Sequence, residues 1–215
     1  MEDHFTRDQV YVEFLKSKGS FSQSSDLESF YRKLDDSTIM WINQSEARGF
    51  GDAVLMSQSI IGNERFLVSA GDVYIPSARD SHIGRLIEFS SKLEAEAIFL
   101  AQEVEEPERH GIVELEEFHD GVYKVKRAVE KPKHPSSEVA IVPIYLFQPI
   151  VFKALAQLNP GVQGETQLTD AIQLLIDWDC RVYAIKLKAE DVRLDIGTPE
   201  AYRHALKVSY DRCSA

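Results

Sequence analysis

The chain has 215 residues, of which 44% are hydrophobic and 27% charged, and its formal net charge is -11. This balance is typical of one large globular domain, and the acidity argues against a nucleic-acid binder, which needs a basic face for phosphates. A small phosphate ligand is not excluded, because a few lysines or a metal can hold one. The charged start resembles no signal peptide, and no apolar run approaches the roughly 18 residues of a membrane span, so we expect a cytoplasmic protein.

Cysteines and histidines show no metal-binding pattern. The two cysteines, Cys180 and Cys213, form no CxxC motif, and no pair of the six histidines has HxxxH spacing. Neither a disulfide framework nor a zinc site is therefore expected.

Apolar runs and helix-period patterns alternate along the chain. The first pattern is a Ser-rich loop at residues 17–26, from which Ser25 or Asp26 would cap a short helix that ends near Leu34. The later helices are predicted at residues 53–60, 83–95, 149–158, 166–178 and 198–210. The strands are predicted at residues 38–43, 65–72, 96–104, 111–115, 121–132, 139–147 and 181–188.

Three short segments predict local geometry. Asp120 and Gly121 would form the turn of a hairpin. Pro143 lies inside a predicted strand, and because proline cannot donate a backbone hydrogen bond, that strand should lie at a sheet edge or contain a bulge. Thr198 followed by Pro199 is the typical start of a helix, with threonine as the N-cap.

The alternation of strands and helices predicts an α/β fold, with a mostly parallel sheet between helices and a single domain over residues 1–215. Ligands of such sheets bind beyond the carboxyl ends of the strands. In this sequence, those positions hold Asp72, Glu130, Lys131 and Asp195.

These residues suggest chemistry with phosphates. Two carboxylates, Asp72 and Asp195, brought together at one sheet edge would hold Mg²⁺ with help from phosphate oxygens, and a lysine would add positive charge. Such a set suits phosphoryl or nucleotidyl transfer. The alternative is that each aspartate is a turn or cap residue. Glu165, between a Gly-rich turn and a helix start, would either cap that helix or accept hydrogen bonds from sugar hydroxyls.

Several motifs together resemble the bacterial UTP–glucose-1-phosphate uridylyltransferases, within the sugar-phosphate nucleotidyltransferase family. "VEKP", "GETQLTDA" and "DIGTPEAY" occur in series, and this series is specific where "VEKP" alone would be weak. The matching stretches span nearly the whole chain in the expected order and are residues 2–5, 43–55, 62–75, 110–115, 129–147, 160–176, 181–187 and 195–202.

The resemblance implies a three-layer Rossmann-like nucleotide-diphospho-sugar transferase fold, Mg²⁺ as cofactor, and UTP, UDP-glucose and glucose 1-phosphate as ligands. It implies no nucleic-acid or membrane partner. By position, Gln44 and Gly49 match base contacts, Asp72 and Asp195 match metal ligands, and Lys131 matches the lysine that reaches the sugar phosphate. The positions that match sugar contacts are Gly111, Glu130 and Glu165.

Some positions depart from the family pattern. Glu138 stands where an asparagine is frequent, and Asp52 stands where a histidine is common. We expect these changes to affect which sugar is bound more than which reaction is catalysed.

The largest departure concerns the phosphate loop. The family has an N-terminal GxGTRLxPxTK segment that cradles the triphosphate, and these 215 residues contain neither that segment nor GxGxxG nor GxxxxGK[ST]. Three hypotheses remain open. In the first, which we favour, the chain is truncated and inactive alone; in the second it is a noncatalytic module that binds a sugar phosphate or nucleotide sugar; in the third it is an enzyme with a rebuilt phosphate site.

The missing segment also has a consequence for the sheet, because the family places its first strands beside the strand that matches residues 65–72. This strand would then present an unpaired edge. Either residues 38–43 pair with it, or another chain adds a strand. We therefore expect the segment before about residue 62 to be the least securely packed, and a homo-oligomer or a complementing N-terminal fragment to complete the protein.

Overall fold

A computed structural model gives the structure of the protein and describes residues 2–76, 82–161, 164–188 and 191–213. The chain divides into two compact units, Met1–Asn43 and Gln44–Ala215. This division does not decide whether residues 1–215 form a single domain, which stays a prediction. No helix within the described ranges is long and apolar enough to cross a membrane.

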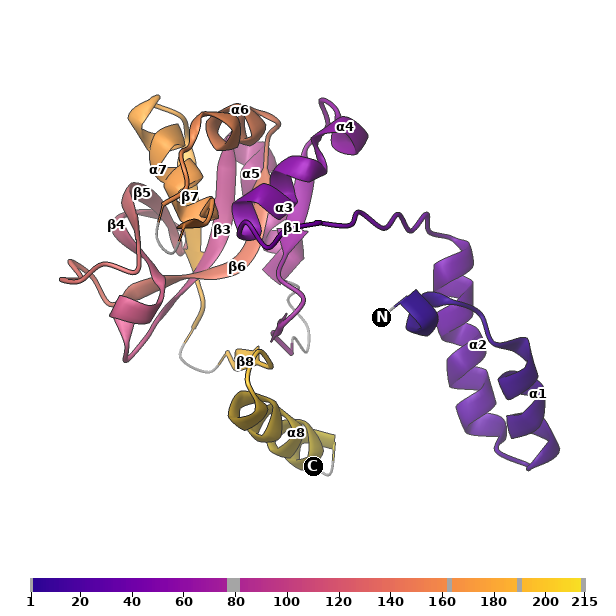
Figure 1. Cartoon of the computed structure of the whole chain (residues 1–215). Coiled ribbons are helices and arrows are strands. Elements are labelled where there is room, and N and C mark those ends of the chain that lie inside the picture. The colour runs from indigo at the N-terminus through magenta and orange to yellow at the C-terminus, as the bar shows by residue number, and fades with distance from the viewer. Residues whose placement is uncertain (1, 77–81, 162–163, 189–190, 214–215) are drawn as a thin grey trace. The chain divides into compact units, whose positions relative to one another are not determined.

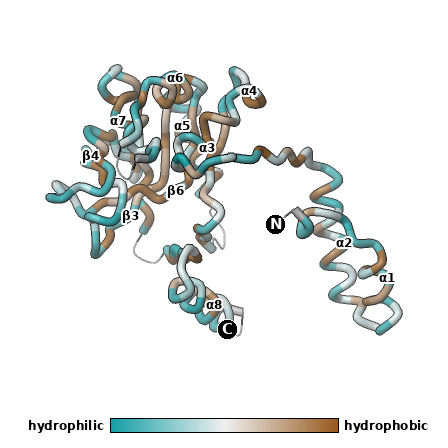
Figure 2. Tube along the Cα trace, viewed as in Figure 1, coloured by the Kyte–Doolittle hydropathy of each residue, from teal (hydrophilic) through white to brown (hydrophobic). Residues whose placement is uncertain are grey.

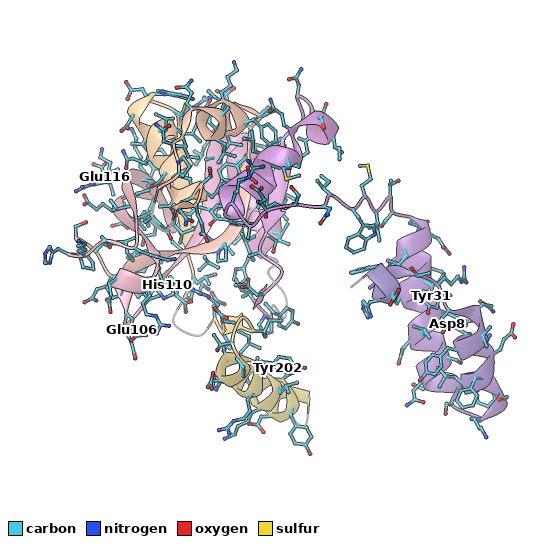
Figure 3. All side chains as sticks on the ribbon, in the orientation of Figure 1. Asp8, Tyr31, Glu106, His110, Glu116 and Tyr202 are labelled. Atoms are coloured by element: carbon cyan, nitrogen blue, oxygen red, sulfur yellow. The ribbon has the colours of Figure 1, made fainter. Side chains whose placement is uncertain are left out.

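The first unit is a helical hairpin. Its elements are η1 (Glu2–Phe5), α1 (Gln9–Ser17) and α2 (Phe21–Asp35), as Figure 1 shows. Asp8 caps α1 by accepting a hydrogen bond from Tyr11 N–H at 2.8 Å. The Asp8 N–H donates to the hydroxyl of Tyr31 at 2.9 Å, and these two residues come from the two arms of the hairpin (Figure 3). Val12, Leu15 and Tyr31 are buried and form the small core of this unit.

The sequence prediction of a Ser-rich loop at residues 17–26 is wrong. The helix α1 extends to Ser17 and α2 already begins at Phe21, so the connection is much shorter. Ser24 is buried in α2, where its hydroxyl donates to the carbonyl oxygen of Phe21 at 3.0 Å. Serine is compatible with a helix when its hydroxyl donates to such a backbone acceptor. A high serine content therefore does not by itself indicate a loop.

The sequence predicts a strand at residues 38–43, and this is also wrong. These residues follow an irregular path, and Ile39, Met40, Trp41 and Ile42 are between 41% and 57% exposed. A strand needs a neighbour for its backbone hydrogen bonds, and apolar side chains do not supply one. The proposed pairing of this segment with residues 65–72 is therefore not present.

Six strands of the second unit form one sheet in the order β1-β6-β3-β7-β5-β4 (Figure 1). Their bounds are β1 (Phe66–Ser69), β3 (Ala97–Glu103), β4 (Gly111–His119), β5 (Val122–Glu130), β6 (Val139–Phe147) and β7 (Val182–Lys186). The strands β1, β3, β4 and β7 run in one direction, and β5 and β6 run in the other. The predicted α/β class is confirmed. The sheet is mixed rather than mostly parallel, because β3 and β7 pair in parallel while the other neighbouring strands described in this sheet pair antiparallel. β1 is a terminal strand, and its neighbour among the described strands of the sheet is β6.

Helices cover both faces of this sheet and give the three layers that the resemblance implies. The helices of the second unit are α3 (Phe50–Met56), α4 (Gln58–Ile61), α5 (His82–Lys92), α6 (Ile150–Gln157), α7 (Leu168–Asp177) and α8 (Pro199–Cys213). Along β3, Phe99 and Ala101 join a core with α3, α6 and α7, whereas Ile98 and Leu100 join a core with α5. Burial on both faces explains why the central strands are apolar runs, which is visible for β6 in Figure 2.

Pro143 marks a bulge inside the sheet. The strand β6 lies between β1 and β3, so the prediction of an edge strand is wrong and the alternative of a bulge is right. Phe99 pairs with Tyr145, but the next residue, Leu100, pairs with Val142. The skipped proline has no N–H to donate, yet its carbonyl oxygen accepts from Ala70 N–H at 2.9 Å.

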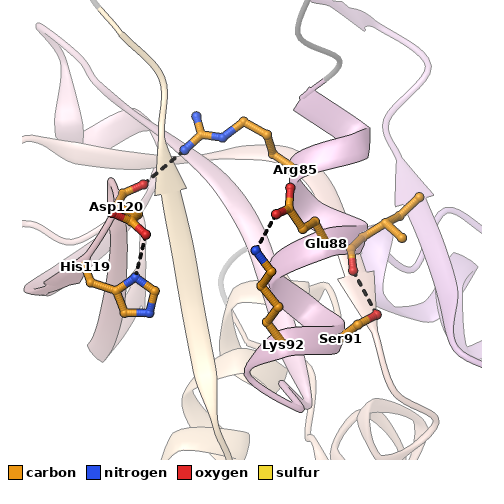
Figure 4. A network of polar contacts seen from close by, with 7 residues as sticks. Arg85, Glu88, Ser91, Lys92, His119 and Asp120 are labelled. Carbon is orange, nitrogen blue, oxygen red and sulfur yellow. Dashed lines mark hydrogen bonds and ion pairs between the residues drawn. The ribbon is translucent and has the colours of Figure 1, made fainter.

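The β4–β5 hairpin turns at Asp120 and Gly121, as predicted. Both residues have positive φ, 53° and 73°, which is the backbone of a two-residue type I′ turn. Arg85 of α5 donates to the carbonyl oxygen of Asp120 at 3.3 Å, and His119 Nδ1 lies 3.2 Å from the Asp120 carboxylate (Figure 4). These contacts hold the tip of the hairpin against α5.

Two very short strands form a second sheet, β2 (Val73–Tyr74) with β8 (Leu194–Asp195). The helix α8 follows β8, and Thr198 caps it by accepting from Ala201 N–H at 3.2 Å. The predicted helix start at Thr198 is therefore confirmed.

Candidate functional site

Gly111, Glu130 and Thr169 meet at one point. The β4–β5 register places Gly111 opposite Glu130, and α7 brings Thr169 onto the same spot. A Cβ atom at position 111 would lie 2.5 Å from Thr169 Oγ1 and 3.0 Å from Glu130 Oε2, so only glycine fits there without displacing them. Two of the predicted sugar contacts are thus neighbours in space, although 19 positions separate them in the sequence.

The carboxyl group of Glu130 is held in an unusual environment. Its side chain is only 11% exposed, and burial raises its pKa above the ordinary value. A hydrogen bond with Thr169 and the positive charge of Lys131 oppose that rise, while Asp170 and Glu165 add to it. Burial also raises the pKa of Asp170. Several acidic groups therefore converge here with little water, which is a feature of binding and catalytic sites.

The raised pKa of Glu130 predicts a gain of stability for Glu130→Gln at neutral pH. The folded protein holds this proton more tightly than the unfolded chain, so the stabilisation is complete below the ordinary pKa and is lost as pH rises through the raised pKa. Glutamine keeps the shape without the charge. We expect a higher melting temperature for the variant at pH 7.5, by about 2–4 °C for each ~1 kcal/mol relieved, and a smaller difference at pH 4.5.

Thermal unfolding followed by circular dichroism at the two pH values measures this effect. Glu116→Gln is the matched control, since Glu116 is exposed on β4 and pairs with Lys126 at 2.8 Å. A melting temperature for Glu130→Gln below that of the wild type at pH 7.5 would contradict the prediction.

The predicted base-contacting loop packs against the predicted sugar contact Glu165. Gly49 has a φ of 99°, and a Cβ atom there would lie 2.8 Å from both Glu165 Cβ and Thr166 O. Thr166 N–H donates to Arg48 O at 2.9 Å, and Gly51 N–H donates to Thr166 O at 2.9 Å. The glycines thus allow the loop before α3 to hydrogen-bond directly to the segment before α7.

Glu165 does not act as a side-chain cap of α7. The residue at the N-cap position is Gln167, and its amide Nε2 donates to Glu165 Oε2 at 2.9 Å. The carboxylate therefore keeps acceptor capacity for another partner. The interpretation of Glu165 as a cap of α7 is therefore wrong, and its role as a sugar contact stays a prediction.

The structure brings the two predicted metal ligands together, as their strand-end positions suggest. In the small sheet, Val73 pairs with Asp195, and Ile196 N–H donates to Asp72 O at 2.8 Å. A Cβ atom at Gly197 would lie 3.2 Å from Asp72 Oδ2 and 3.3 Å from Asp195 Oδ1. Both carboxylates thus border the same small space over Gly197.

This pair of carboxylates fits Mg²⁺. Magnesium in phosphate-transfer sites is usually bound through one or two carboxylates, with water and substrate phosphates as the other ligands. In the described residues, no group of three or more histidine, cysteine, aspartate or glutamate side chains could hold a metal by itself. A metal held by Asp72 and Asp195 would need further ligands, such as water or phosphate oxygens.

Lys131 follows Glu130 in the chain, and its backbone contacts His110, which lines a pocket beside Asp195. Its backbone has a φ of 41°, which is uncommon for a residue with a side chain, and its N–H donates to His110 O at 3.0 Å. The ammonium lies 4.0 Å from Glu130 Oε1. His110 and Glu106 (labelled in Figure 3) line a pocket of about 350 Å³ together with Asp195. Burial lowers the pKa of His110, so its ring is biased towards the neutral form.

Sequence reasoning missed three residues near this site, namely Thr169, His110 and Arg193. The guanidinium of Arg193 lies 3.6 Å from Asp195 Oδ2 and lines the same pocket, and its buried Nε has no hydrogen-bond partner in the described part of the chain. A signal for it was present in the sequence, because Arg193 lies only two residues before the predicted metal ligand Asp195.

Comparisons with known proteins show the family of the chain. The family model described as nucleotidyl transferase matches residues 13–211. The chain belongs to the nucleotidyl transferase family. A UTP–glucose-1-phosphate uridylyltransferase of Pseudomonas aeruginosa is 31% identical over 216 residues, covering 98% of this chain and 75% of that protein. A relative of Staphylococcus saprophyticus with the same activity in its name is 33% identical over 201 residues, covering 92% and 67%.

Solved structures of nucleotidyl transferases give the same result. A UDP-glucose pyrophosphorylase complexed with UDP-glucose has a TM-score of 0.82 and 28% identity, covering 98% of this chain and 76% of that chain. An apo UDP-glucose pyrophosphorylase has a TM-score of 0.86 and 27% identity, covering 98% and 77%. The resemblance to the uridylyltransferase group and the Rossmann-like fold of this nucleotidyl transferase are therefore confirmed. The roles of its individual site residues stay predictions.

Proposed function

We propose that the chain takes part in the transfer of a uridylyl group from UTP to glucose 1-phosphate. A phosphate oxygen of glucose 1-phosphate attacks the α-phosphorus of UTP, the bond from that phosphorus to the bridging oxygen breaks, and UDP-glucose and pyrophosphate form. The observation that carries this proposal is the meeting of Glu130, Gly111 and Glu165 around the start of α7, next to the Gly49 loop. That arrangement supports a ligand with a base at one end and a sugar at the other.

Each end of such a ligand has suitable partners. Glu130 and Glu165 offer carboxylate oxygens to sugar hydroxyls, and the absence of a side chain at Gly111 leaves the room that Thr169 and Glu130 need. Gln44 and Gly49 would contact the base. Lys131 would place its ammonium against the sugar phosphate, and the strained φ of its backbone is consistent with a functional position.

Asp72 and Asp195 would hold Mg²⁺ in this proposal. When bound, the metal supplies neutralisation of phosphate charge. The chain's own residues bind and orient the substrates, which is most of the work in this class of reaction.

A second candidate function is a noncatalytic nucleotide-sugar-binding module. The observation that favours it is that these 215 residues contain the positions proposed to contact the base and the sugar but no GxGTR-type phosphate loop. Under our proposal, that loop is supplied by residues outside this stretch or by another chain, and the protein works in the cytoplasm as a homo-oligomer or with the complementing segment. The exposed terminal position of β1 is consistent with the addition of a strand.

Two measurements test these functions. A pyrophosphate-release assay with UTP, glucose 1-phosphate and Mg²⁺ should show negligible turnover by the 215 residues and measurable turnover after co-expression with a segment that carries the glycine-rich loop. A ligand-observed NMR titration should show binding of UDP-glucose to the 215 residues alone. Binding without turnover in either form would support the binding module, and the absence of both would reject both functions.

A further inference from the structure

The amide of Gln44 is fixed in one orientation. Its Nε2 donates to Asp52 Oδ2 at 2.6 Å and to the carbonyl oxygen of Gly49 at 3.3 Å. Both partners accept hydrogen bonds and cannot donate them, so the nitrogen of the amide must face them and the oxygen must face away. The two N–H groups of Gln44 are therefore used inside the protein, and Oε1 is the atom that is left for a ligand.

Asp52 is well placed to impose this orientation. It lies in the first turn of α3, its side chain is 16% exposed, and the guanidinium of Arg48 lies 3.7 Å from the same Oδ2. The positive charge of Arg48 compensates the carboxylate. A histidine at this position, in contrast, would offer a donor or an acceptor according to its tautomer.

We propose that Asp52 is a positioning residue that makes the base site selective for a ring N–H donor. This inference rests on the proposed function, in which Gln44 contacts the base. Uracil carries a hydrogen on N3 and can donate it to Gln44 Oε1. Cytosine has an unprotonated N3, so two acceptors would face each other. A site built to hydrogen-bond one partner discriminates strongly against an analogue that leaves its polar group unpaired.

The experiment compares UDP-glucose with CDP-glucose in ligand-observed NMR titrations of the 215-residue chain. The two ligands share the sugar and the phosphates, so the ratio of their dissociation constants isolates the base. We expect UDP-glucose to bind at least about tenfold more tightly to the wild type, as for one unpaired polar group. In Asp52→Asn, the amide at position 52 can donate or accept, and only the longer contact with Gly49 O, at 3.3 Å, still favours the original orientation of Gln44. Gln44 can then turn over, and the ratio should fall to within about threefold.

Glu46→Gln is the matched control. It removes the same charge from a carboxylate near the same arginine, at 3.9 Å from Arg48 Nε, but no hydrogen bond joins Glu46 to Gln44 among those of the described residues. Its ratio should remain that of the wild type. If Asp52 only stabilised α3, the Asp52→Asn change would weaken both ligands by the same factor and leave the ratio unchanged.

A ligand change tests the same idea without any variant. The nucleotide 3-methyl-UMP lacks the N3 hydrogen, so we expect it to bind the wild type at least about tenfold more weakly than UMP. Equal binding of UDP-glucose and CDP-glucose, or an unchanged ratio in a folded Asp52→Asn variant, would overturn the proposal and leave the proposed function intact. Binding of neither nucleotide sugar would reject the proposed function, and the role of Asp52 with it.

Discussion

One methyl group at position 111 should remove most of the affinity for UDP-glucose. In Gly111→Ala, the new Cβ atom would lie 2.5 Å from Thr169 Oγ1, closer than real side chains tolerate, and 3.0 Å from Glu130 Oε2, which is a tight contact. Both neighbours are anchored, Thr169 on α7 and Glu130 at the end of β5, so the strain must shift the carboxylate that we assign to the sugar. Overpacking of this kind costs about 1–3 kcal/mol, and we expect at least about a tenfold loss of affinity.

The NMR titration with UDP-glucose measures the loss, and thermal unfolding measures the strain. Gly71→Ala is the matched control, because a Cβ atom there meets nothing within 4 Å and its φ is not positive. It should change stability by no more than about 0.5 kcal/mol. A Gly111→Ala variant that binds UDP-glucose within threefold of the wild type would show that this group of residues is not the sugar site.

The central strands could be predicted because burial on both faces leaves a clear pattern. In residues 97–101, Ile98 and Leu100 face α5 while Phe99 and Ala101 face the other helices, so this run is apolar. The order and direction of the strands could not be read in this way. An example is β6, which inserts between β1 and β3 because of contacts between residues far apart in the sequence.

The first unit shows where local patterns fail. Residues 38–43 have the composition of a strand, but a strand exists only where another strand offers its edge. The helix α1 was overlooked although its signals were local, since Asp8 is an N-cap and Val12 and Leu15 have helical spacing. Exposed apolar residues in this short helix, such as Val10 at 79%, obscure the spacing of the buried ones.

The candidate site residues within sequence motifs could be predicted, but the residues that hold them in place could not. Glu130 and Lys131 could be named because they end an apolar run and match "VEKP". Thr169, which contacts Glu130 and limits position 111, comes from a helix 39 positions later in the sequence. That contact follows from the packing of α7 on β5, and no periodicity within either segment encodes it.

Loss of either carboxylate beside Gly197 should abolish the effect of Mg²⁺ on the binding of UDP-glucose. The backbone of β2 and β8 fixes Asp72 and Asp195 on the same small space, where each can supply one oxygen to a metal. The wild type should bind UDP-glucose more tightly with Mg²⁺ than with EDTA, because the metal bridges the protein and the phosphates. Changes to residues that only hydrogen-bond a metal's ligands already weaken metal sites by about 10–100-fold, so Asp72→Asn and Asp195→Asn should each remove at least about tenfold of the Mg²⁺ effect.

The decisive quantity is the ratio of dissociation constants in EDTA and in Mg²⁺, measured for each variant. Asp120→Asn is the control, since it removes the same charge from an exposed turn residue whose positive φ asparagine tolerates. Each site variant should bind UDP-glucose in EDTA about as well as the wild type, because the base and sugar contacts are retained. If Asp195→Asn kept the full Mg²⁺ effect, the metal would have to be held by the ligand's phosphates alone. The two aspartates would then lie close together only because β2 pairs with β8, and not because they bind a metal.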